Sequence, residues 1–312
     1  MKKPTRAQHF VQRAYLAGFC DQHLNDGMRK PFLRVFSPEM PMKRRTPETC
    51  AVKKWFYCFD QDGKRSFAIE EILSEMESAS SAVLDGARKG RLPSATKDRL
   101  TLAGYIALSM VRTPTAKKIV DQAYIDHQME RFRALIDTPG QLEVYLQEHE
   151  QKTGIRRDAA EDRRKLKGGR IRVSQTNHAW SLRMMFAQLS IFQRRIMSMH
   201  WTLLQSNAAF LTSDNPVILY SPRDRQSDVQ RGRMEPDLIF PISRQFCLIG
   251  SASPVDHYAV IDDDQTKLIN IASIKRAERF VYSPFDALYI QEELDETHAL
   301  RMKTMKSDSI QL

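Results

Sequence analysis

The stretch FLTSDNPVILY, residues 210–220, marks the point at which the chain changes from helical to β-type sequence. Two apolar segments surround a polar group, Ser213-Asp214-Asn215-Pro216. Short apolar runs between turn residues indicate strands, and an Asn-Pro pair favours a turn. We therefore expect two strands joined by a turn that projects the Asp214 carboxylate from a strand end. The simpler alternative is an ordinary turn in which Ser213 or Asp214 bonds nearby backbone N–H groups.

Upstream of this stretch the apolar residues recur mostly at helical spacing, and Gly and Pro residues mark the expected ends. A first helix is expected over the segment that holds Phe10, Val11, Tyr15 and Phe19. The pattern predicts short strands over residues 31–38 and 50–60, and helices over residues 66–90, 97–114, 115–137, 139–154 and 177–201.

Downstream of residue 201, short β-rich runs alternate with turn residues, and a late helix is predicted over residues 264–278. Helices first and strands afterwards favour an α+β fold, in which a helical N-terminal two thirds packs on a smaller, mainly antiparallel β C-terminal part. We expect one domain, residues 1–312. Its expected parts are a helical part with short N-terminal strands (1–157), an exposed basic loop (158–172), and a long helix followed by the β-rich part (173–312).

The composition narrows the class of protein. The 312 residues carry a formal net charge of +10, which favours a polyanionic partner such as nucleic acid, although 38 acidic residues among 48 basic ones also fit a merely basic surface. No apolar run approaches the roughly 18 residues of a membrane helix, and no export signal is visible, so we expect a cytoplasmic protein without a membrane partner. The four scattered cysteines form no zinc-binding pair. The oligomeric state is not defined by the sequence.

Three carboxylates and an arginine are candidates for chemistry. Glu70 and Glu77 are seven residues apart, which places them on one face of the predicted helix two turns from each other. With Asp214 they would supply the oxygen ligands that Mg²⁺ or Mn²⁺ prefers. Arg112 ends a very apolar helix and would clamp a phosphate or carboxylate, or simply complement the helix dipole. The alternative for the glutamates is an ordinary solvated surface.

His9 and Gln12 are three residues apart near the N-terminus. A histidine beside apolar residues is usually structural, but a neutral imidazole also serves as a metal ligand or a general base. Gln12 and Asn215 are candidates for substrate binding, together with Arg112.

Six segments occur in an order that resembles the bacterial family called domain of unknown function 4238. They are QHFVQRAYLAGF, AIEEILSEME, MVRTP, FLTSDNPV, FPISRQFCLIG and LINIASIKRAERFVYS, and together they extend from His9 to about Ser283. Two positions depart from the family pattern. Arg244 stands where a second proline is usual, and Gln12-Arg13 stands where Pro-Gln is common.

The resemblance implies a fold family and no activity. It does place His9, Glu70, Glu77, Arg112 and Asp214 in the polar motifs of the family, which suggests that they form one site.

Two functions fit these residues. The first is a metal-dependent phosphodiesterase, most simply a nuclease, for which a bacterial toxin or phage-defence effector is the expected setting. In it Glu70, Glu77 and Asp214 hold the metal, His9 is a ligand or base, and Arg112 steadies the phosphate. The second is a non-catalytic protein that binds nucleic acid or another protein, in which the same residues form a buried network between the helical and β parts.

Overall fold

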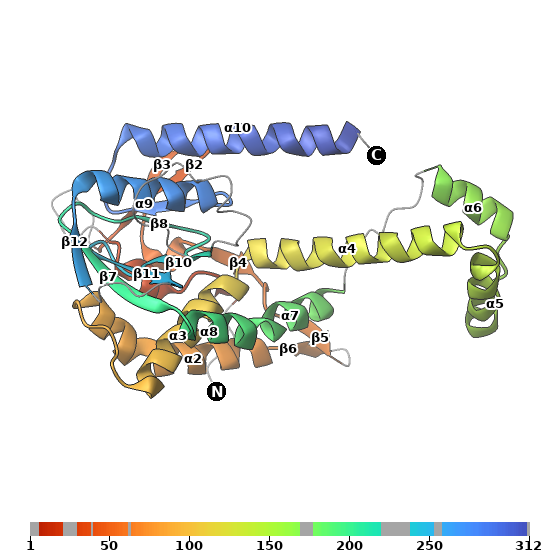
Figure 1. The fold of residues 1–312 in the computed structure, drawn as a ribbon, viewed down its shortest axis with the longest axis horizontal. Helices are drawn as coiled ribbons and strands as arrows, with labels where there is room; N and C mark the ends of the chain where they lie inside the picture. The colour runs from red at the N-terminus through yellow and green to blue at the C-terminus, as the bar shows by residue number, and fades with distance from the viewer. Residues whose placement is uncertain are drawn as a thin grey trace.

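A computed structural model describes residues 6–20, 30–38, 40–61, 64–168, 177–219, 238–252 and 258–310 (Figure 1). The helices are α1 (Arg13–Ala17), α2 (Ala68–Arg88), α3 (Thr96–Val111), α4 (Pro114–Asp137), α5 (Gln141–Thr153), α6 (Ala159–Lys167), α7 (His178–Ala187), α8 (Leu189–Met197), α9 (Asp263–Arg276) and α10 (Leu288–Ile310), with a short 3₁₀ helix, η2 (Pro47–Thr49). The strands are β1 (Ala7–His9), β2 (Leu33–Ser37), β3 (Met40–Arg45), β4 (Val52–Lys54), β5 (Phe59–Gln61), β6 (Lys64–Ser66), β7 (His200–Ser206), β8 (Thr212–Ser213), β9 (Ile218–Leu219), β10 (Leu238–Pro241), β11 (Phe246–Ser251), β12 (Tyr258–Ile261) and β13 (Val281–Ser283).

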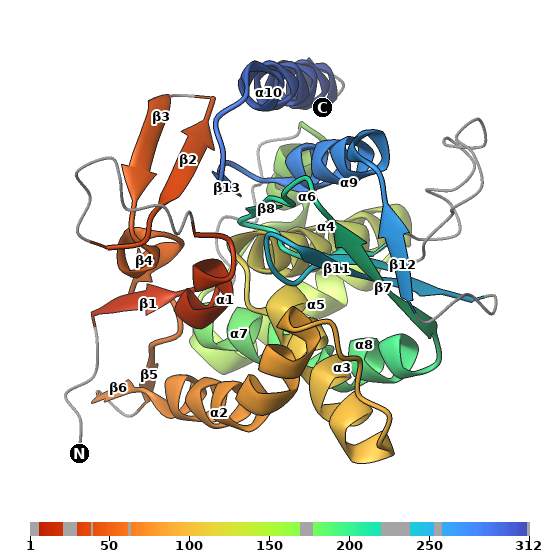
Figure 2. The ribbon, with the colours of Figure 1, turned by 90° about the vertical axis from the view of Figure 1, so that its left-hand side faces the viewer.

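Two sheets form the centre of the molecule. One has the strand order β12-β7-β11-β10-β9, and the other has the order β3-β2-β13-β8. All of their pairs are antiparallel except β12 with β7, which is parallel. Two small ribbons, β1 with β4 and β5 with β6, lie beside these sheets. In Figure 2 both ribbons are on the same side of the molecule, with β5 and β6 next to α2 and β1 next to α1.

The predicted division into a helical N-terminal part and a β C-terminal part is wrong. Strands β1 to β6 all lie within the first 66 residues, and β2 pairs with β13 across most of the chain length. The C-terminal part also holds two long helices, α9 and α10. Strands pair where they can bury a shared apolar face. The order of helix-rich and strand-rich segments along the chain therefore does not reveal which strands share a sheet.

Helix α3 is the centre of the main core. From Leu102 to Leu108 every residue is buried, because α2 and α8 pack on it from either side. Helix α1 is fixed to both sheets by one side chain: the Tyr15 hydroxyl lies 2.8 Å from Thr212 Oγ1 and donates to the Pro241 carbonyl at 2.7 Å.

Helix α4 projects from this body as an arm, with α5 and α6 at its far end (Figure 1). Among its residues only Val120 is buried. Helix α7 runs back along the arm, and Ser181 Oγ donates to Asp121 Oδ1 at 2.6 Å. No helix in the described ranges has both the length and the apolar character required to cross a membrane.

Several local predictions were confirmed and others were wrong. The helices predicted over residues 66–90, 97–114, 115–137, 139–154 and 264–278 are present as α2, α3, α4, α5 and α9. The first predicted helix is wrong in its start, because residues 7–9 form β1 and only Arg13–Ala17 are helical. The predicted loop 158–172 is wrong over Ala159–Lys167, which forms α6, and residues 169–172 lie outside the described part. The helix predicted over residues 177–201 divides at Gln188 into α7 and α8 and ends before β7.

Candidate functional site

Arg112 joins four distant segments. It is the C-cap residue of α3 and is 4% exposed. Its Nη1 lies 2.5 Å from Glu77 Oε1 on α2, and its Nη2 donates to the His9 carbonyl at 2.7 Å. Its own carbonyl accepts a 2.7 Å hydrogen bond from the Tyr57 hydroxyl. Arg112 therefore pairs with polar groups of β1, of α2 and of the turn that follows β4. In this way it links these three segments to α3.

Gln8 extends this arrangement toward Glu70. It is buried, its Oε1 accepts from the Tyr57 N–H at 2.7 Å, and its Nε2 donates to Cys58 Sγ at 3.1 Å. Burial raises the pKa of Glu70, while a hydrogen bond from Gln8 and the charge of Arg112 oppose this increase. Sequence reasoning missed Gln8, because its burial follows from the alternation of a strand in a segment that was expected to be helical.

His9 belongs to the same network through its backbone. Its carbonyl binds Arg112, whereas its buried Nε2 has no hydrogen-bond partner among the described residues. Burial lowers the pKa of His9; a backbone hydrogen bond at Pro47 opposes this effect, and the charges of Arg112 and Arg13 add to it. The imidazole is therefore neutral near pH 7, because its pKa lies below the ordinary value of 6.5.

We expect the stability of the protein to fall on acidification partly through His9. The unfolded chain takes up a proton on this imidazole as the pH falls through 6.5, before the folded protein does, so the free energy of unfolding decreases there. Between about pH 7.5 and about pH 5.5 the wild type should lose more stability in urea than His9→Gln does. The same comparison with His127→Gln, a change at an exposed histidine of α4, serves as the control. If the free energy of unfolding changes with pH by the same amount in the wild type and in His9→Gln, the prediction is contradicted.

Gln12 lies close to this network but contacts a different partner. Its Oε1 accepts a hydrogen bond from the Tyr105 hydroxyl of α3, and it is the N-cap residue of α1 without using its side chain as a cap. The side chain thus connects α1 to α3. Its predicted role in binding substrate remains a prediction.

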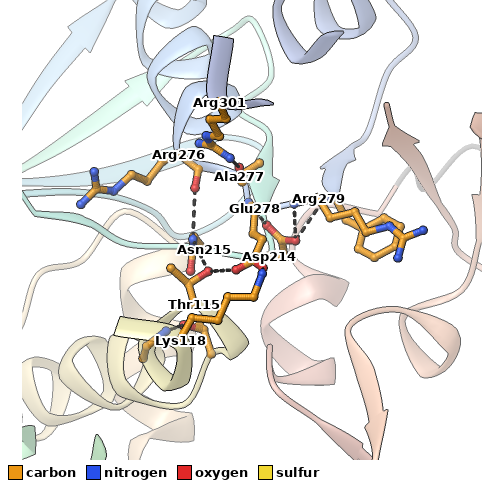
Figure 3. Close-up of polar contacts among 12 residues, drawn as sticks. Thr115, Lys118, Asp214, Asn215, Arg276, Ala277, Glu278, Arg279 and Arg301 are labelled. Carbon is orange, nitrogen blue, oxygen red and sulfur yellow. Dashed lines mark hydrogen bonds and ion pairs between the residues drawn. The ribbon is translucent and has the colours of Figure 1, made fainter. Parts of the chain in front are cut away.

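Asp214 lies in a second network, which Figure 3 shows. Its Oδ1 accepts from the Glu278 N–H at 2.7 Å, and its Oδ2 accepts from the N–H groups of Arg279 and Phe280, each at 2.9 Å. The side chain is 5% exposed. Burial raises the pKa of Asp214 to about 6, although the three backbone donors act in the opposite direction. Both oxygens therefore hold the segment that enters β13.

Side chains around Asp214 connect this segment to the arm helix. Asn215 Nδ2 donates to Thr115 Oγ1 at 2.9 Å and to the Arg276 carbonyl at 3.1 Å (Figure 3). Thr115 also donates to the Glu278 carboxylate, which forms an ion pair with Lys118 of α4. Ser213 Oγ accepts from the Asn215 N–H at 3.2 Å, as expected for the ordinary turn.

The predicted site residues thus divide between two networks. His9, Glu70, Glu77 and Arg112 lie together, whereas Asp214 and Asn215 lie with Thr115 and Glu278. Within the described part of the chain, no three His, Cys, Asp or Glu side chains converge in a group that could hold a metal ion. Glu70, Glu77 and Asp214 in this arrangement therefore do not fit the coordination of Mg²⁺ or Mn²⁺, which requires converging oxygen ligands.

A third feature, which sequence reasoning missed, surrounds Trp55. The residue follows β4 with a φ angle of +56°. The Arg65 guanidinium carbon lies 4.2 Å from the centre of its ring, and that of Arg6 lies 5.7 Å away. The two ribbons also carry the exposed lysines Lys53, Lys54 and Lys64. We call Arg6, Lys53, Lys54, Trp55, Lys64 and Arg65 the Trp55 patch. Lys53, Lys54 and Trp55 are consecutive in the sequence, whereas the position of Arg65 of β6 against the ring depends on the fold.

The fold and its networks define a mixed helix-and-sheet protein whose polar motif residues tie remote segments together. The chain belongs to the family described as "Protein of unknown function (DUF4238)", whose model matches residues 7–285. Comparisons with curated proteins and with solved structures find no match.

Proposed function

We propose that this protein binds nucleic acid without cleaving it, and that the two polar networks maintain its fold. The observation that supports binding is the Trp55 patch, in which Arg6 and Arg65 flank a half-buried indole ring and the two ribbons add three exposed lysines. Lysine and arginine displace counterions from phosphates, and guanidinium groups and aromatic rings stack on bases. The net charge of +10 also favours association with nucleic acid, over a longer range.

The contacts of the acidic side chains support a structural role for the networks. Glu77 is paired with Arg112, and both oxygens of Asp214 accept backbone N–H groups. A metal-dependent nuclease would need Asp214 to leave its three donors and join Glu70 and Glu77. Breaking a hydrogen-bonded charged group out of such surroundings costs about 1.5–3 kcal/mol per bond. The nuclease is therefore the less favoured function.

A binding assay with charge-reversed variants tests this proposal. Labelled single- and double-stranded DNA and RNA are titrated with protein at several salt concentrations, with Mg²⁺ and with EDTA, and the integrity of the strands is checked afterwards. Lys53→Glu/Lys54→Glu should weaken binding by more than about 10-fold and make the salt dependence shallower by about 1 to 2 in log–log slope, since two phosphate contacts are lost.

A matched control carries the same change in charge at the far end of α2. Arg91 and Lys97 are both exposed, and they lie beyond the end of this 21-residue helix, which begins beside β6. Arg91→Glu/Lys97→Glu should bind nearly as well as the wild type. Equal weakening by both double variants would mean that only net charge matters, and metal-dependent cleavage would favour the nuclease instead.

A further inference from the structure

A cleft of about 440 Å³ opens beside Trp55. It is lined by Trp55, Cys58, Phe59, Asp60, Arg65, Asn177, His178 and Ala179. These residues come from the turn after β4, from the β5–β6 ribbon and from the start of α7, so the cleft exists only in the folded protein. Its volume is in the range of small-molecule sites, and it combines two aromatic rings with a few polar groups, as such sites do.

The backbone of Trp55 is held in an unfavourable conformation at the mouth of this cleft. A φ of +56° is uncommon for a residue with a bulky side chain. The Trp55 N–H donates to the Arg6 carbonyl at 3.1 Å, and its carbonyl accepts from the Cys58 N–H at 3.3 Å. The turn buries Phe56, Tyr57 and Cys58 and leaves the indole half-exposed. Such strain persists where the surrounding structure imposes it, and it is common at ligand-binding sites.

The side chains of Arg65 and Asn177 suit a planar heterocycle attached to a phosphate, and the carboxylate of Asp60 also lines the cleft. Arg65 is stacked 4.2 Å from the indole centre, where its planar guanidinium can bind a phosphate or extend the stack. Asn177 caps α7 with its Oδ1, which accepts from Ala179 and Trp180, so its amide nitrogen is the group that can donate to a base carbonyl.

His178 supplies a neutral ring to the same cleft. Burial lowers its pKa, assisted by the charge of Lys117 and opposed by hydrogen bonds to the backbone of Phe56 and Cys58. A neutral imidazole can stack on a base without adding charge.

We propose that this cleft binds one unpaired base of a single-stranded nucleic acid, with Trp55 and Arg65 as the stacking groups. This inference rests on the proposed nucleic-acid binding and names its substrate class. The bases of a duplex are stacked in the helix interior, so only their edges are accessible, whereas an unpaired base presents its face to an aromatic side chain. The basic residues of the Trp55 patch would follow the backbone on either side of this base.

The test uses the full chain, a single-stranded oligonucleotide with one 2-aminopurine base, and the same oligonucleotide in a duplex. Stacking on the indole should quench the 2-aminopurine fluorescence of the single strand. Trp55→Leu should weaken single-strand binding by about 10- to 100-fold, the effect of losing one base–aromatic stack, and change duplex binding by less than about 2-fold. Trp55→Phe should retain most of the affinity.

Asn177→Ser provides a second variant that does not depend on the strained turn. Serine keeps the helix cap but removes the amide donor, so the fold is preserved while single-strand binding should weaken by about 3- to 10-fold. Circular dichroism and melting curves confirm that each variant is folded.

The outcomes separate the two proposals. Equal, salt-dependent binding of single strand and duplex, unaffected by Trp55→Leu and Asn177→Ser, would overturn the base cleft and leave nucleic-acid binding intact. No binding of either form at low salt would overturn both.

Discussion

Replacing Arg112 with methionine is expected to lower the free energy of unfolding by about 4 kcal/mol, the typical cost of removing one partner from a buried ion pair. The change leaves the Glu77 carboxylate without its cation and the His9 carbonyl without its donor, while methionine preserves much of the side-chain volume. Urea denaturation of both proteins measures the difference.

Two comparisons establish the cause of this loss. Arg183→Met, at an exposed arginine of α7, should change stability by less than about 0.5 kcal/mol. The double variant Arg112→Met/Glu77→Leu should be more stable than the sum of the two single effects predicts, because each single change leaves an unpaired charge. If Arg112→Met lowers the free energy of unfolding by less than about 1 kcal/mol, then solvent already screens the Arg112 and Glu77 charges, and their pairing does not stabilise the fold.

Replacing Asp214 with alanine is expected to lower the free energy of unfolding by about 3 kcal/mol. Three backbone N–H groups lose their acceptor, and each unsatisfied buried donor costs about 1–3 kcal/mol, reduced here by water that enters the space. Asp214→Asn keeps one side-chain oxygen and should lose less. Hydrogen exchange of the amides of Glu278, Arg279 and Phe280 should become faster in both variants.

The control for Asp214 is Asp286→Ala, which removes an exposed carboxylate that follows β13. This change should alter the free energy of unfolding by less than about 0.5 kcal/mol. If Asp214→Ala is folded with unchanged stability, the carboxylate is not a structural anchor, and a role in chemistry regains support. The same measurement therefore bears on the nuclease.

The long helices were predictable because each carries its own signal. In α4 and α5 the boundaries follow from residues at the helix ends, such as Pro114 at the first position of α4 and Gly154 just after α5. The two-residue strand β8 was also visible as an apolar run before a polar turn. Helix α10 was not predicted, and neither was β12.

The errors share a physical cause. His9, Phe10 and Val11 were placed in a helix by their spacing, but Phe10 N–H donates to the Ala51 carbonyl at 2.9 Å and Ala7–His9 pair with β4. A partner more than forty residues away overrode the local pattern. The sequence around Gly168 and Gly169 suggested a loop, although the residues before them form α6, since Ala, Glu, Arg, Lys and Leu are good helix formers.

The sequence by itself determined the family, most of the helices and several of the polar residues that matter to the fold, among them Arg112 and Asp214. Those residues interrupt apolar segments, where an unsatisfied polar group is costly, so each one needs a partner. Which partner it takes was decided only by the tertiary structure. Arg112 pairs with Glu77 and with a carbonyl of β1, while Asp214 accepts hydrogen bonds from three backbone amides before β13. Each buried polar group binds the partners that packing brings nearest to it. The residues predicted as one site thus became two networks, and the cleft beside Trp55 arose from segments whose proximity no spacing in the sequence records.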